Sequence, residues 1–150
     1  MKDAAGVEPP EHLPETIHAA FVEGATCHAV GCHNAAGTMF RLCVDLATRI
    51  LLPEGEENGL NRKVRRDLGL RLPWLFDHGH IPEGLRDLSS CIKEDGNDGA
   101  HAGTLSAEDA EDLLDFTKAL LERMYTEPKR IELAKARRED RRAKPKGETK

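Results

Sequence analysis

The sequence predicts an all-α protein, a bundle of four to five core helices followed by a charged C-terminal helix or tail. Aromatic residues make up only 4% of the chain, β-branched residues are scarce, and Ala, Leu, Glu, Asp and Arg dominate. Apolar residues recur three and four positions apart in several segments, whereas no segment alternates as a half-buried strand would. Together these patterns favour helices packed on helices.

Length and charge predict one domain with two flanking segments. A chain of 150 residues suits a single core. We expect an N-terminal tail over residues 1–12, the bundle over 13–126, and a basic helix or tail over 127–150. Residues 1–126 hold 12 basic and 22 acidic side chains, a net charge of −10, whereas residues 127–150 hold 10 and 5, a net charge of +5. The acidic residues 1–126 should therefore repel nucleic acid on average, whereas the basic residues 127–150 should not.

The sequence also predicts a cytoplasmic protein that does not enter a membrane. No stretch approaches the roughly 18 apolar residues of a membrane span, and the first residues lack the apolar centre of a signal peptide. The cysteines at positions 27, 32, 43 and 91 follow no disulfide framework, so we expect reduced thiols.

Two helices are expected in the first third of the chain. The first begins near Pro14 and ends near Gly31, a residue suited to a left-handed turn. Its inward positions are Ile17, Phe21, Ala25 and His28. The second covers about residues 32–52 and is stopped by Pro53. Its apolar stripe consists of Ala36, Met39, Phe40, Cys43, Val44, Ala47, Ile50 and Leu51.

The middle of the chain is less regular. Residues 61–70 are basic and predict either a short helix or an ordered loop. The next helix should hold Pro73 in its first turn and stop at Gly79, with Leu72, Leu75 and Phe76 inward. Another should start with Pro82, with Leu85, Leu88 and Ile92 inward.

The last core helix has the clearest start signal, because Ser106 and Asp109 resemble a capping box. Its apolar stripe, Leu113, Leu114, Thr117, Leu120, Leu121 and Met124, runs to about Tyr125. Beyond Pro128 the chain is charged on all sides, as in a solvated helix or a frayed tail. The expected core consists of Phe21, Met39, Phe40, Val44, Leu75, Leu88, Ile92, Leu114 and Leu121.

Several motifs, taken in order, resemble a known family. The segments "LPETIHAAFVEGATCHAVGCHNAAGTMFRLCVDLATR", "LPWLFDHGHIPEGL" and "GNDGAH" precede the capped last helix. Over residues 13–125 the chain resembles the bacterial domain of unknown function 4145, which is grouped with the HEPN helical bundles. The most specific features are Gly96 and Asn97 followed by Ala100 and His101, and Arg41 followed by the acid Asp45.

The resemblance implies a possible ribonuclease. HEPN nucleases cut RNA without metal at a dimer interface, with an Arg that holds phosphate and a His, separated from it by four to six residues, that moves a proton. Here the positions expected for the Arg hold Glu94, Asp95 and Gly96. The candidate catalytic residues are therefore His101, Asn97, Lys93 and Arg41. The alternative is that Asn97 and His101 only satisfy backbone groups at a helix end.

Other clusters are weaker candidates. A basic cluster, Arg62, Lys63, Arg65 and Arg66, would bind phosphate, as would Arg137, Arg138, Arg141 and Arg142 near the C-terminus, but neither has interleaved aromatic residues. The "CHAVGCH" segment offers Cys27, His28, Cys32 and His33 to zinc, yet a turn at Gly31 would separate the two cysteines and no second ligand pair follows. We expect no metal and no cofactor.

These observations predict a noncatalytic helical interaction module that forms a homodimer or docks on a larger bacterial partner, for example of a defence or restriction system. One alternative is a divergent, metal-independent ribonuclease of the HEPN type. The other is an accessory protein that binds nucleic acid through its basic segments.

Overall fold

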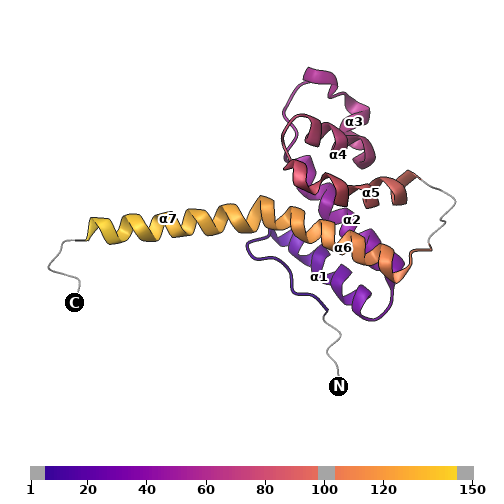
Figure 1. The fold of residues 1–150 in the computed structure, drawn as a ribbon, viewed down its shortest axis with the longest axis horizontal. Coiled ribbons are helices and arrows are strands. Elements are labelled where there is room, and N and C mark those ends of the chain that lie inside the picture. Colours follow the sequence, from indigo (N-terminus) through magenta and orange to yellow (C-terminus); the bar gives the residue numbers. More distant parts are fainter. Residues whose placement is uncertain (1–5, 98–103, 145–150) are drawn as a thin grey trace.

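The protein is an all-α helical bundle, shown as a computed structural model that describes residues 6–97 and 104–144, apart from the side chains of 93–97 (Figure 1). The described residues contain no β-strand. The helices are α1 (Glu15–Ala29), α2 (His33–Arg49), α3 (Arg62–Arg66), α4 (Leu68–Asp77), α5 (Arg86–Asn97), α6 (Ala107–Leu121) and α7 (Glu127–Ala143). Short 3-10 turns cover Glu57–Gly59 and Glu83–Leu85, and a π-helical turn covers Glu122–Thr126.

Helices α1 and α2 form a tightly packed hairpin. Gly31 joins them with a φ of 86°, the left-handed conformation expected from the sequence. The rings of Phe21 and Phe40 lie 5.7 Å apart between the two helices. Gly24 permits this approach, because a Cβ atom at that position would lie 2.7 Å from Cε1 of Phe40.

Helix α6 packs on α2, and α1, α2, α4, α5 and α6 all contribute to one core (Figure 1). Most of the expected core positions are buried, and Met39 is half-buried. Leu88 is an error of the sequence analysis, because 44% of its surface is exposed. A 3-10 turn advances about 120° per residue. Leu85 therefore packs inward from that turn, while Leu88 lies at the margin of the packed face. Ile50 was also wrongly assigned inward, since α2 ends at Arg49 and leaves it 66% exposed.

The middle segment contains two capped helices. Asn61 accepts a hydrogen bond from the Val64 amide and starts α3, so the basic segment is a short helix rather than a loop. Asp67 caps α4 through the Gly69 amide at 2.9 Å. This early cap places Pro73 inside α4 instead of in its first turn, contrary to the expectation. Pro73 is exposed, so the helix loses one hydrogen bond near its solvent-facing side.

The last two helices are continuous. The capping box at Ser106 and Asp109 is present, with both reciprocal hydrogen bonds near 3 Å. The π turn lies directly before Pro128, whose ring would clash with the carbonyl of Met124 in a regular α-helix. Helix α7 then continues away from the bundle as a helix, not a frayed tail, and has no buried residue (Figure 1). None of the described helices combines the length and apolar character needed to cross a lipid bilayer.

Candidate functional site

Arg41 on α2 reaches the C-terminal half of α5, where the resemblance placed the candidate site. Its Nη1 atom donates a hydrogen bond of 2.8 Å to the backbone carbonyl of Ile92. Lys93 follows Ile92 in the chain. The structure therefore brings Arg41 next to this segment, which sequence alone does not establish.

A surface hollow of about 450 Å³ lies beside Arg41. It is lined by Thr38, Arg41, Leu42, Asp45, Arg66, Asp67 and Leu68. Two residues proposed from different parts of the sequence, Arg41 and Arg66, thus share one hollow. Asp45 and Asp67 line it too, but both oxygens of Asp45 are already paired, with Arg71 and Arg49, so Asp67 is the carboxylate left to offset Arg41 and Arg66.

Arg71 is the residue at this site that the sequence analysis missed. Its side chain is fully buried, and its Nη1 atom lies 2.6 Å from Oδ1 of Asp45 and 3.1 Å from Oγ1 of Thr48. Its Nε atom donates to the carbonyl of Arg65 at 3.0 Å. Its Nη2 atom donates to the same carbonyl, so every branch of the guanidinium has an acceptor, as a buried charge requires. The available signal was its spacing, three residues after Leu68 and four before Leu75, on the apolar side of α4.

The basic cluster on α3 does not act as one surface. Arg65 donates to the carbonyls of Pro53 and Gly55 at 2.5 and 2.6 Å, so its charge stabilises the preceding loop. Arg62, Lys63 and Arg66 are exposed, and only Arg66 of the four lines the hollow. The geometry therefore separates the structural Arg65 from its three exposed neighbours.

The remaining catalytic candidates fall outside what the structure describes. His101 lies outside the described residues, as do the side chains of Lys93 and Asn97. Of the four candidates, Arg41 alone has a described side chain, and its hydrogen bond goes to a backbone carbonyl.

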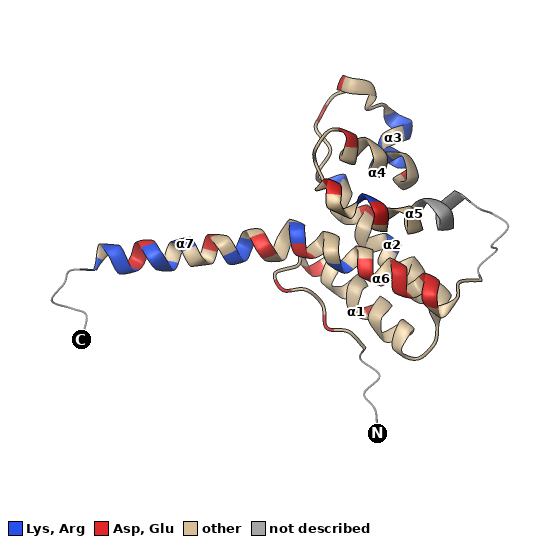
Figure 2. Ribbon diagram, in the orientation of Figure 1, with Lys and Arg blue, Asp and Glu red and all other residues tan. Residues whose placement is uncertain are grey.

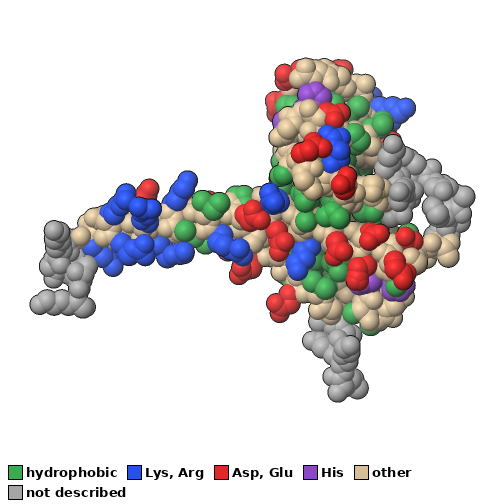
Figure 3. All heavy atoms as spheres, in the orientation of Figure 1, with side chains coloured by type: hydrophobic (Ala, Val, Ile, Leu, Met, Phe, Trp, Pro, Cys, Tyr) green, Lys and Arg blue, Asp and Glu red, His purple; other side chains and the backbone are tan. Residues whose placement is uncertain are grey.

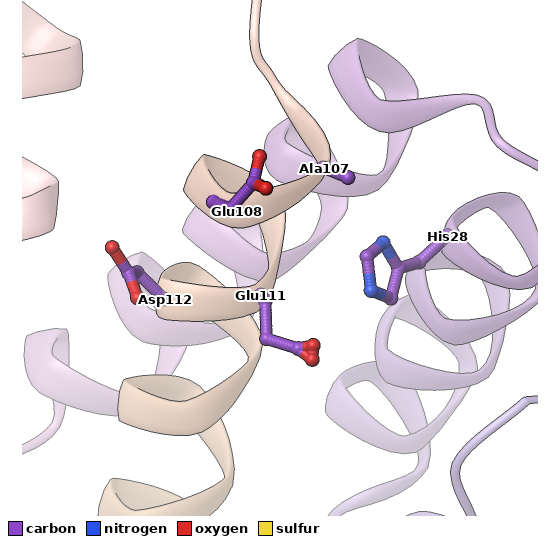
Figure 4. Close-up of a pocket in the computed structure, with 5 residues that line it drawn as sticks. All are labelled: His28, Ala107, Glu108, Glu111 and Asp112. Atoms are coloured by element: carbon purple, nitrogen blue, oxygen red, sulfur yellow. The ribbon is translucent and has the colours of Figure 1, made fainter.

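A second hollow, of about 290 Å³, lies between the end of α1 and the first turns of α6 (Figure 4). It is lined by His28, Ala107, Glu108, Glu111 and Asp112. The imidazole of His28 points across the hollow toward α6, with Glu111 on the facing side (Figure 4). The carboxylates make this hollow acidic, in contrast to the mixed charge beside Arg41.

The histidines of "CHAVGCH" contact each other. The rings of His28 and His33 meet edge to face at 5.3 Å, and the Nδ1 atom of each is buried without a hydrogen-bond partner among the described residues. Cys27 is half-buried and Cys32 exposed. Across residues 6–92 and 104–144, no three His, Cys, Asp or Glu side chains lie in an arrangement that would hold a metal ion.

The thiol of Cys43 is buried and stays protonated at neutral pH. Burial in the core raises the pKa of its thiol to about 12, because a thiolate would be desolvated there. Its Sγ atom lies 3.7 Å from the carbonyl of Ile17 on α1. A protonated, buried thiol is a packing group and not a nucleophile at neutral pH.

Comparison with known proteins places the chain in a family. Residues 23–141 match the family model described as Domain of unknown function (DUF4145), a range that begins in α1 and includes most of α7. No curated protein and no solved structure matches the chain. Since the match covers well over half of the 150 residues, the protein belongs to the DUF4145 family.

Proposed function

We propose that this protein is a noncatalytic, HEPN-like interaction module of bacteria that pairs with itself or docks on a larger protein, such as a component of a defence or restriction system. The observation that carries the proposal is α7, a helix of 17 residues with no buried residue. Most helical stability in proteins comes from a packed face, which α7 lacks within its own chain. A partner would supply that face.

The geometry beside Arg41 supports a noncatalytic role. Its guanidinium donates to the Ile92 carbonyl, and Asp45 and Asp67 line the same hollow. An RNA phosphate entering there would compete with the Ile92 carbonyl for Arg41 and would meet the carboxylate of Asp67, whereas Asp45 is already paired with Arg71 and Arg49. This arrangement stabilises the α2–α5 contact better than it would stabilise a phosphorane-like transition state.

Site-specific crosslinking tests the proposal. A photoreactive phenylalanine analogue would replace exposed Ala134 in α7 and, as a control, exposed Glu56 in the loop before α3. The full-length chain is irradiated in its native host, and adducts are identified by mass spectrometry. We expect protein adducts from position 134 and few from position 56. Absence of protein adducts from position 134 would contradict the proposal.

A metal-independent ribonuclease is the second candidate, favoured by the hydrogen bond that brings Arg41 to the backbone of Ile92, the residue before Lys93 in the chain. In that case RNA would be cut in the presence of a chelator, and both His101→Ala and Arg41→Ala would abolish cutting without lowering the melting temperature. Under our proposal the purified protein does not cut single-stranded RNA, and His101→Ala changes stability alone.

A further inference from the structure

The turn between α1 and α2 has a cysteine on each side. Cys27 lies in the last turn of α1, and Cys32 directly precedes α2. The Cys32 amide donates a hydrogen bond of 2.8 Å to the Cys27 carbonyl. Inside this bond, the Gly31 amide donates one of 3.1 Å to the His28 carbonyl. With Gly31 in the left-handed conformation, the two bonds define a Schellman motif, a common end of an α-helix.

This motif brings the two cysteines together. Standard bond lengths and angles around the 2.8 Å hydrogen bond limit the separation of their Cα atoms to roughly 6.5 Å or less. Disulfides join Cα atoms that lie about 4.4–6.8 Å apart. In Schellman motifs the side chains at these two positions commonly contact each other. The expectation that a turn at Gly31 would separate Cys27 from Cys32 is therefore wrong.

The next pair of residues shows the same approach of side chains. His28 and His33 follow the two cysteines directly and are likewise five positions apart. Their rings lie 5.3 Å apart, edge to face. Residues with this spacing therefore present their side chains to one another across the turn.

The two thiols differ in their access to solvent. Cys32 is exposed, whereas Cys27 is half-buried and packs against the core. Both are free thiols in the structure. A small oxidant in solution therefore reaches Cys32 first, and Cys27 is the neighbouring thiol that can react with the product.

We propose that Cys27 and Cys32 are a redox modification site, which a peroxide converts into a reversible disulfide. The Cys32 sulfur attacks one oxygen of hydrogen peroxide, the O–O bond breaks, and a sulfenic acid and one water form. The Cys27 sulfur then attacks the Cys32 sulfur, the S–O bond breaks, and a second water leaves. Two thiols lose two electrons and two protons, and one peroxide is reduced to two waters.

The charge around the turn favours a neutral oxidant. Glu108, Glu111 and Asp112 line the hollow that His28 faces. Figure 2 shows acidic residues gathered on the first turns of α6, and Figure 3 shows acidic and histidine side chains together on this surface. These carboxylates repel anionic disulfides such as glutathione disulfide, but not hydrogen peroxide. The site is therefore suited to peroxides, and this inference does not depend on the proposed function.

Peptide mapping tests the disulfide. The reduced, full-length protein is treated with about two molar equivalents of hydrogen peroxide, remaining thiols are blocked with N-ethylmaleimide, and the chain is cut with trypsin. Residues 3–41 form one tryptic peptide, which contains Cys27 and Cys32, whereas Cys43 lies in the next. We expect the first peptide to be unblocked and about 2 Da lighter than its reduced form. Dithiothreitol should restore both thiols, and Cys43 should stay reduced throughout.

The double variant Cys27→Ser/Thr26→Cys keeps the number of thiols but moves one by about 100° around α1. It should form the disulfide at least about 10-fold more slowly, because the new thiol points away from Cys32. Gly31→Ala strains the turn and should slow the disulfide at least about 3-fold. Gly79→Ala is the matched control, since Gly79 ends α4 in the same motif with a φ of 75°. It should not change the rate, and circular dichroism verifies that each variant is folded.

Three outcomes would overturn the proposal: thiols that peroxide leaves unchanged, a disulfide between two chains, or equal rates for Cys27→Ser/Thr26→Cys and the original protein. Glutathione disulfide should oxidise the site more slowly at about 20 mM than at about 500 mM salt, because salt screens the carboxylates. Faster oxidation by glutathione disulfide than by peroxide at low salt would contradict a peroxide as the oxidant. None of these results depends on crosslinks from α7, so the proposed function and the redox site fail separately.

Discussion

At the scale of single residues, the fully buried Arg71 joins α4 to α2. Its guanidinium is neutralised by Asp45, whose side chain is 21% exposed, and it also bonds Thr48 and the Arg65 carbonyl. Removing one member of a buried pair is costly because the other charge stays behind without its counterion. Asp45, which follows Arg41 by one helical turn, is therefore a structural residue of the α2–α4 contact.

Asp45→Asn is expected to lower the free energy of unfolding by about 2–4 kcal/mol, somewhat less than for a fully buried pair because Asp45 retains contact with water. Urea denaturation measures the change. Arg49→Ala is the control, since Arg49 pairs with the same carboxylate at 2.6 Å but is 60% exposed. It should cost only about 0.5 kcal/mol. Equal effects of the two substitutions would contradict the structural role of the Asp45–Arg71 pair.

Cys43 should make stability fall at alkaline pH. Its folded pKa of about 12 lies above the ordinary value of 9.0, so the folded state holds a proton that the unfolded state releases. The contribution is complete below pH 9 and declines by about 1.4 kcal/mol per pH unit between 9 and 12. Denaturation at pH 8 and pH 10.5 measures this slope.

Cys43→Ala is the comparison for this slope, because Tyr and Lys side chains also titrate in that range. The difference in slope between the original protein and the variant isolates the thiol. A thiol-specific reagent at pH 8 should modify exposed Cys32 and leave Cys43 unmodified in the folded protein. Identical slopes for the two proteins would argue against a desolvated thiol.

At the scale of helices, the α1–α2 hairpin depends on a close approach at Gly24. Gly24→Ala places a Cβ 2.7 Å from the ring of Phe40 and 3.1 Å from Cβ of Met39, so the helices must separate. We expect a net loss of about 1–2 kcal/mol, the overpacking cost less the better helix propensity of Ala. Gly84→Ala, where a Cβ meets nothing within 4 Å, should leave the melting temperature nearly unchanged. A Gly24→Ala variant as stable as the original would exclude this close packing.

Helices with strong local signals could be predicted from the sequence. Helices α1, α2 and α6 have long apolar stripes, and the end of α1 at Gly31 and the start of α6 at the Ser106 capping box were recognisable, whereas α2 ends at Arg49, before the expected stop at Pro53. Helix α4 was harder, because Asp67 caps it one and a half turns before Pro73 and no apolar run marks that start. The periodicity of apolar residues also shows which side of a helix faces the core, but not how far the neighbouring helices extend over that side. Leu88 was misassigned for this reason.

The candidate site was less predictable than the fold. Arg41 was identified through the family resemblance, but its hydrogen bond to the Ile92 carbonyl joins groups 51 residues apart. The acceptor is a backbone carbonyl, which every residue has, so no pattern of side chains in the sequence predicts this hydrogen bond. Arg71 was missed because arginine is rarely fully buried, and its burial depends on Asp45 from another helix.

At the scale of the whole molecule, α7 should be the least protected helix of a monomer. It buries nothing in its own chain, so its amide hydrogens should exchange rapidly in dilute protein, while those of α2 and α6 exchange slowly. Hydrogen exchange with mass spectrometry at low and high protein concentration measures this. Protection of residues 130–143 should rise at least about 10-fold with pairing. Strong protection that does not depend on concentration would contradict an unpartnered α7.

The connection between α2 and α4 has a consequence for protein engineering. Its polar composition suggests a segment that tolerates insertion, as most surface loops do. Yet Arg65 holds the carbonyls of Pro53 and Gly55, and the Trp74 indole donates to the carbonyl of Asn58 at 2.9 Å. Tags, protease sites or new chain termini introduced between residues 53 and 60 would disrupt a network that ends at the buried Arg71.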